Sequence, residues 1–113
     1  MLNNRRNIMK KTLLIINSLT GNGRNKVHTF DLLSRLSKDD TIVTVFPVDG
    51  YFQRNLADYL NSDEYDSVVC VGGDGTLNIT VNEVMKLENK PVIGYIPAGT
   101  TNDFSLLIYY SSV

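Results

Sequence analysis

Four short apolar runs, each followed by a polar or glycine-rich stretch, divide this chain of 113 residues. Three of the runs are almost continuously apolar, and the other alternates apolar residues with threonine. They lie at residues 13–16, 41–46, 68–71 and 91–96. Continuous apolar runs of this length are typical of strands that are buried on both faces of a parallel sheet. The pattern therefore predicts four strands in a mainly parallel sheet.

Apolar residues recur at helical spacing in each segment between these runs. The positions are Val27, Phe30, Leu33 and Leu36 in the first segment, Phe52, Leu56, Tyr59 and Leu60 in the second, and Leu77, Val81, Val84 and Met85 in the third. The first helix is predicted over residues 24–37, with these positions forming one apolar face. A further helix is predicted from Phe104 onward, because Asn102 or Asp103 can cap its start.

The alternation of strand and helix predicts a three-layer α/β/α domain with right-handed crossovers. Pro47 and the turn residues after it are expected to end the second strand. Glycine-containing loops follow the first and third strands, and ligands bind such sheets at strand carboxyl ends beside a topological switch point. The first and third strands are therefore expected to be neighbours, in the strand order 2-1-3-4.

Five consecutive residues after the third strand read Gly-Gly-Asp-Gly-Thr and lead into a helix, an arrangement that directs backbone N–H groups at an anion. Gly72, Gly73 and Gly75 lack a Cβ, so the turn can adopt positive φ and a phosphate can approach it closely. Asp74 would repel a phosphate unless a divalent cation lay between them, and Mg²⁺ prefers oxygen ligands and phosphates. The turn is therefore a candidate site for phosphate and Mg²⁺, with Thr76 adding a hydroxyl group.

Two motifs resemble those of a known family. The Gly-Gly-Asp-Gly-Thr turn is similar to the GGDGT signature of the diacylglycerol kinase catalytic domain, which belongs to a broad group with NAD kinases, phosphofructokinases and sphingosine kinases. Residues 97–104 read PAGTTNDF and resemble the P-x-GT-x-NDF motif of soluble lipid kinases, which NAD kinases lack. The resemblance extends from about Lys11 to Phe104, and two ordered motifs form a more specific signal than one.

The resemblance implies an ATP-dependent kinase that transfers the γ-phosphoryl group to a lipid hydroxyl, such as that of diacylglycerol, at a membrane surface. It implies ATP and Mg²⁺ as ligands, with Asp74 as the catalytic residue and metal ligand. The nucleotide-binding residues that it implies are Asn17, Ser18, Gly21, Gly72, Gly73, Gly75, Thr76, Thr100 and Asn102. It also implies a second, β-rich domain that carries the acceptor site. Because these 113 residues contain no such domain, we expect the chain alone to lack lipid kinase activity.

The length suits one compact domain, which we assign to residues 11–113 after a basic leader at residues 1–10. Residues 1–38 hold eight Lys or Arg and one acidic residue, so this part could meet ATP phosphates or an anionic membrane surface. Cys70, the only cysteine, lies in an apolar run, which indicates a buried thiol and a reducing compartment. No apolar run is long enough to span a membrane. We therefore expect a cytoplasmic protein with peripheral access to the membrane.

Several other functions lack their sequence signals. There is no G-x-G-x-x-G order for a dehydrogenase, no Walker lysine after the glycines, and no Cys or His cluster for zinc. The net charge of −1 gives no argument for binding to nucleic acid. An NAD kinase-like enzyme and a non-catalytic nucleotide-binding remnant of a truncated gene stay as alternatives, and homodimer formation stays open.

Overall fold

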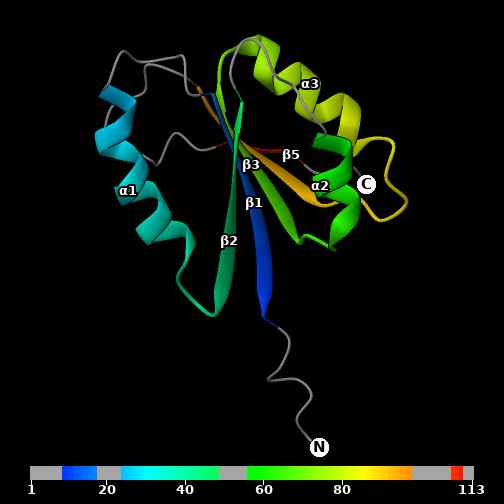
Figure 1. The fold of residues 1–113 in the computed structure, drawn as a ribbon, viewed down its shortest axis with the longest axis horizontal. Helices are drawn as coiled ribbons and strands as arrows, with labels where there is room; N and C mark the ends of the chain where they lie inside the picture. The colour runs from blue at the N-terminus through cyan, green and yellow to red at the C-terminus, as the bar shows by residue number, and fades with distance from the viewer. Residues whose placement is uncertain (1–8, 18–23, 49–55, 98–107, 111–113) are drawn as a thin grey trace, which may run out of the picture.

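The computed structural model describes residues 9–17, 24–48, 56–97 and 108–110 of the chain. Strands and helices alternate until the last element, which is a short strand (Figure 1). The elements are β1 (Lys10–Asn17), α1 (Arg24–Leu36), β2 (Thr41–Val48), α2 (Leu56–Ser62), β3 (Ser67–Gly72), α3 (Asp74–Val84), β4 (Val92–Pro97) and β5 (Ile108–Tyr110). The four predicted strands are thus all present, with ends that differ from the predicted ones by a few residues.

The sheet has the strand order β2-β1-β3-β4-β5. The pairs β1–β2, β1–β3 and β3–β4 are parallel, so the predicted order 2-1-3-4 is confirmed. The fifth strand pairs antiparallel with β4 and occupies residues for which we predicted a helix, so that prediction is wrong at residues 108–110. Isoleucine and tyrosine favour strands, and pairing covers one edge of β4. Phe104, where the helix was expected to begin, lies outside the described residues.

Both faces of the sheet are covered, which confirms the three-layer architecture. In β1, Leu13 and Ile15 point to a core shared with α2 and α3, whereas Leu14 points to a second core shared with α1. Figure 1 shows α1 on one side of the strands and α2 with α3 on the other. Because successive side chains of a strand point to opposite faces, the continuous apolar run of β1 supplies both cores.

The buried face of α1 differs from the predicted one. Phe30 is 78% exposed, whereas Leu32 is only 4% exposed and belongs to the core. Leu33 and Leu36 pack against that core, as predicted, and Val27 lies outside the part whose side chains are described. Three residues advance about 300° around a helix, so positions that recur every third residue drift around it rather than form one face. The spacing of residues 32, 33 and 36 matches a true helical stripe.

Two further differences follow from position in the fold. Strand β2 continues through Pro47 to Val48, although we expected Pro47 to end it. Proline has no N–H to donate, but β2 pairs only with β1 among the described strands, and an edge strand tolerates this loss. In α3, Leu77 and Val81 pack on the core as predicted, whereas Met85 is 51% exposed because it is the C-cap residue.

Lys11 connects the amino end of β1 to the segment between α2 and β3. Its backbone N–H donates to Asp66 Oδ2 at 2.8 Å, and its Nζ lies 3.0 Å from Asp63 Oδ1. The Lys11 ammonium group, helped by the backbone N–H of Glu64, holds the pKa of the Asp63 carboxyl below its usual value. These contacts hold the amino end of β1 beside the segment that enters β3, at the edge of the sheet opposite the glycine turn. No helix in the described part of the chain is long and apolar enough to cross a membrane.

Candidate functional site

The glycine turn joins the central strand β3 directly to α3. Gly72 ends β3, Gly73 is the N-cap residue, and Asp74 is the first residue of the helix. The backbone N–H of Leu77 donates to the Gly73 carbonyl at 3.1 Å, and no side chain caps the helix. The first N–H groups of a helix have no acceptor inside it, so an uncapped start is suited to an anion. The turn therefore has the polarity that a phosphate needs.

Gly73 and Gly75 leave open space at the start of the helix. A Cβ built on Gly73 or on Gly75 would have no heavy atom within 4 Å. Gly73 has φ −94° and ψ −169°, an extended backbone that any residue adopts, so our expectation of positive φ is wrong at this position. The glycines are therefore not required by backbone strain here. Their effect is to leave unfilled the volume that a phosphate would occupy as it approaches the backbone.

Asp74 is exposed at the helix start, where its negative charge interacts favourably with the helix dipole. Within the described ranges, no group of three or more His, Cys, Asp or Glu side chains could hold a metal by itself. This arrangement fits Mg²⁺, which is commonly bound by one or two carboxylates together with substrate phosphates.

Four polar side chains form a layer under the turn, between the sheet and α3. Tyr95 of β4 donates its hydroxyl to the Gly72 carbonyl at 3.2 Å, and Thr80 Oγ1 donates to the Thr76 carbonyl at 2.8 Å. Cys70 is fully buried beside Thr80, and this burial raises the pKa of its thiol to about 11. The prediction of a buried thiol is confirmed. Thr76 is also buried, so its side chain lies below the surface of the turn.

The sequence missed Tyr95 and Thr80 as neighbours of the site. Both lie in stretches that are otherwise apolar or helical, and neither belongs to a motif. The strand register places Tyr95 of β4 opposite Cys70 of β3, and the packing of α3 on the sheet places Thr80 beside Cys70. The one available signal was that Tyr95 carries a hydroxyl within a run of strand type. A buried tyrosine hydroxyl usually finds a hydrogen-bond partner, so a polar contact near this position could have been expected.

The carboxyl ends of three parallel strands meet at this edge of the sheet. Ile16 of β1 lies opposite Val71, so Asn17 and Gly72 follow at the same edge. Gly72 in turn lies opposite Pro97, the last residue of β4. The structure thus brings together Asn17, the glycine turn and the start of the second motif. The other residues implied in nucleotide binding lie outside the described residues: Ser18, Gly21, Thr100 and Asn102.

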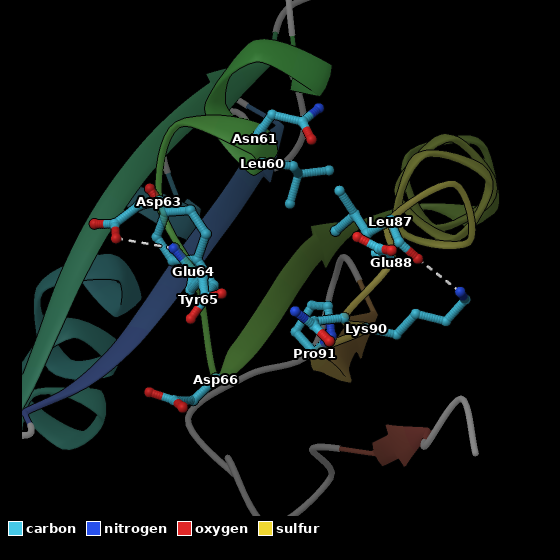
Figure 2. Close-up of a pocket in the computed structure, with 11 residues that line it drawn as sticks. Leu60, Asn61, Asp63, Glu64, Tyr65, Asp66, Leu87, Glu88, Lys90 and Pro91 are labelled. Atoms are coloured by element: carbon cyan, nitrogen blue, oxygen red, sulfur yellow. Dashed lines mark hydrogen bonds between the residues drawn. The ribbon is translucent and has the colours of Figure 1, made fainter.

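A separate cavity of about 430 Å³ lies at the opposite edge of the sheet, between the segments that enter β3 and β4 (Figure 2). Asp63, Glu64, Asp66 and Glu88 line it together with one lysine, Lys90. The Lys90 ammonium donates to the Leu87 carbonyl at 2.6 Å. Lys11 pairs with Asp63, and the acidic residues still outnumber the basic ones in this hollow, so it repels a nucleotide triphosphate and does not compete with the glycine turn as a phosphate site.

Comparison with known proteins decides the family. The model of the diacylglycerol kinase catalytic domain family matches residues 11–112, which is nearly the whole chain. The chain belongs to the diacylglycerol kinase catalytic domain family. The matched residues begin at Lys11, near the start of β1, and include both motifs. They therefore also include the glycine turn, the polar side chains beneath it and the end of β4.

Similar proteins carry the diacylglycerol kinase name. A diacylglycerol kinase of Bacillus subtilis is 34% identical over 101 residues, which cover 86% of this chain and 32% of that protein. One from Staphylococcus aureus is 32% identical over 101 residues, covering 88% and 32%. A crystal structure of a diacylglycerol kinase from Bacillus anthracis matches with a TM-score of 0.61 and 29% identity, over 85% of this chain and 33% of that one. The chain therefore spans about a third of the length of these family members.

Proposed function

We propose that this chain is the nucleotide-binding part of a lipid kinase, which binds ATP with Mg²⁺ and presents the γ-phosphoryl group to a lipid hydroxyl such as that of diacylglycerol. The observation that carries the proposal is the uncapped start of α3, with open space at Gly73 and Gly75. Membership of the diacylglycerol kinase catalytic domain family supports the choice of nucleotide and acceptor.

Each part of the turn has a separate role in this proposal. The backbone at Gly73 and Gly75 receives the phosphates, because no side chain blocks their approach. Asp74 would provide an anionic oxygen to hold Mg²⁺, and the ion would supply positive charge beside the phosphates. Asp74 is thus a catalytic residue through the metal, and the backbone positions the nucleotide.

The loops that follow β1 and β4 complete the proposed nucleotide site. Both strands end at the same edge of the sheet as the glycine turn. The motif residues that would contact the nucleotide from these loops are Asn17, Ser18, Gly21, Thr100 and Asn102. The side chain of Thr76 is buried, so the part of this residue that we propose to face the phosphates is its backbone N–H.

The acceptor is proposed to be reached at a membrane surface from the cytoplasm. Residues 1–38 carry eight Lys or Arg and one acidic residue, and anionic lipid headgroups attract such segments. Of these charges, Arg24 begins α1 after the loop that follows β1, so it would favour ATP at the edge of the glycine turn, because unlike charges raise the local concentration of a polyanionic ligand. Lys11 lies at the opposite edge of the sheet, where it is paired with Asp63.

Nucleotide titrations test the proposal. We expect the chain to bind ATP in the presence of Mg²⁺, and the backbone amides of residues 73–76 to show the largest shifts in ¹⁵N NMR spectra. A Glu88→Gln variant, which removes a charge at the opposite cavity, should bind ATP as the unchanged chain does. No binding of ATP, or shifts confined to the opposite cavity, would overturn the proposal. Binding of NAD in preference to ATP would favour the NAD kinase-like alternative.

A further inference from the structure

Tyr95 connects the neighbouring strand to the peptide on which the glycine turn begins. Its side chain is 8% exposed, and its hydroxyl donates to the Gly72 carbonyl at 3.2 Å. The two residues are 23 positions apart in the sequence and lie on adjacent strands. The contact is buried, so water does not replace it readily when it is lost.

The Gly72 carbonyl and the Gly73 N–H belong to the same peptide group. A trans peptide is planar, so its C=O and N–H point in opposite directions and turn together. Glycine on both sides removes the Cβ contacts that would otherwise restrict rotation of this unit. A donor that fixes the carbonyl on the buried side therefore also fixes the N–H, which points in the direction opposite to the carbonyl.

The parallel ladder between β3 and β4 ends at this point, where Gly72 lies opposite Pro97, the last residue of β4. The hydroxyl of Tyr95 therefore contacts β3 at its last residue, directly before the glycine turn. Phenylalanine in place of Tyr95 would keep the aromatic ring and remove only the hydroxyl. The role of the hydroxyl can therefore be tested separately from the packing of the ring.

We infer that Tyr95 is a positioning residue of the nucleotide site, whose hydroxyl holds the Gly72–Gly73 peptide in the orientation that presents the Gly73 N–H to a phosphate. The inference rests on the proposed function for the nature of the ligand. The orientation of the peptide can nevertheless be measured without any ligand, so the two proposals can fail separately.

The test compares Tyr95→Phe with the unchanged chain and with Tyr65→Phe. Tyr65 is a half-buried tyrosine at the opposite edge of the sheet, where it lines the cavity in Figure 2, so its variant is a control for loss of one hydroxyl. In ligand-free ¹⁵N NMR spectra, we expect Tyr95→Phe to shift and broaden the Gly73 amide signal, because the peptide samples a second orientation. Affinity for ATP and for inorganic tripolyphosphate should fall by about threefold to tenfold, the effect of one neutral hydrogen bond. The control should change neither.

Each outcome decides one part of the inference. An unchanged Gly73 signal in Tyr95→Phe would overturn it, whatever the nucleotide affinity. A changed signal with unchanged affinity for both probes would also overturn it, because the peptide would then not serve the phosphate. Equal loss of affinity in the two variants would indicate a general effect on packing. If the unchanged chain binds neither probe, the proposed function fails, while the ligand-free spectra still decide whether Tyr95 fixes the peptide.

Discussion

The backbone N–H of Leu77 donates to the carbonyl of Gly73 at 3.1 Å, which makes Gly73 the N-cap residue of α3. Gly73 brings no side chain to this position, so the helix start is left for another acceptor. A serine, threonine or aspartate there would satisfy the first N–H groups internally and would stabilise the helix. The chain forgoes that stabilisation at the edge of the sheet where three parallel strands end.

Replacement of Gly73 by valine separates the fold from the site. The φ and ψ of Gly73 are extended, which valine can also adopt, and a Cβ at this position would meet no atom within 4 Å. We therefore expect Gly73→Val to fold, with a melting temperature lowered modestly because valine is a poorer N-cap than glycine. Its side chain would occupy the space for phosphate, so ATP affinity measured by calorimetry should fall at least about tenfold. An unchanged affinity would remove the turn from the nucleotide site.

Gly75→Ala gives a sharper contrast, because stability and binding should change in opposite directions. Gly75 lies in the first turn of α3, where alanine is the better helix former by about 0.5–1 kcal/mol. The new methyl group meets no protein atom, so urea unfolding should report a more stable chain. Calorimetry should report weaker ATP binding, since the methyl group projects into the proposed phosphate space. A variant that is stabilised and binds ATP normally would contradict this assignment of Gly75.

The architecture was predictable because each buried strand carries its own signal. The run at residues 13–16 supplies two cores at once, and only a strand with both faces covered needs continuous apolar character. The apolar face of α1 was predictable only in part. Apolar residues in α1 recur at spacings of both three and four, and the two spacings predict different buried faces. Phe30 is exposed and Leu32 is buried because of the way the helix is rotated against the sheet. Strand β5 was missed because its pairing with β4 is not encoded in a local pattern.

The site was predictable where its residues are consecutive. Gly73, Asp74 and Gly75 lie together in the chain, so one motif locates all three at a strand-to-helix turn. The contact between Tyr95 and Gly72 depends on the register of two strands, and a shift of that register by one residue would turn the tyrosine to the other face. Such a relationship requires the three-dimensional structure.

Asp74→Asn tests whether this carboxylate holds the metal. The amide keeps the size and hydrogen-bonding oxygen of the side chain but removes its negative charge, which a hard cation such as Mg²⁺ requires. We expect ATP affinity measured with Mg²⁺ to fall by more than the affinity measured in chelator. Without the metal, loss of a charge that repels phosphate should leave binding equal or slightly tighter. A Glu88→Gln control removes a carboxylate remote from the turn. Equal losses with and without Mg²⁺ would make Asp74 a residue of the turn alone.

The buried thiol of Cys70 makes stability depend on alkaline pH. Burial raises its pKa from 9.0 to about 11 in the folded chain, with the hydrogen bond to Thr80 opposing a small part of this change. Below pH 9 the thiol is protonated in both states, and stability is complete. Between pH 9 and about 11 the unfolded chain loses the proton while the folded chain keeps it, so the free energy of unfolding should fall, in total by about 2–3 kcal/mol.

Urea unfolding at a series of pH values from 8 to 11 measures this loss, and Cys70→Ala is the matched control. The alanine variant should be less stable at pH 8 because it leaves a small cavity in a fully buried position. All other residues are the same in both chains, so their contribution cancels in the difference. The gap between the two unfolding free energies should therefore narrow as pH rises. A gap that stays constant would mean that the thiol of Cys70 ionises as readily in the folded chain as in the unfolded one, and that the layer beneath the glycine turn is open to water.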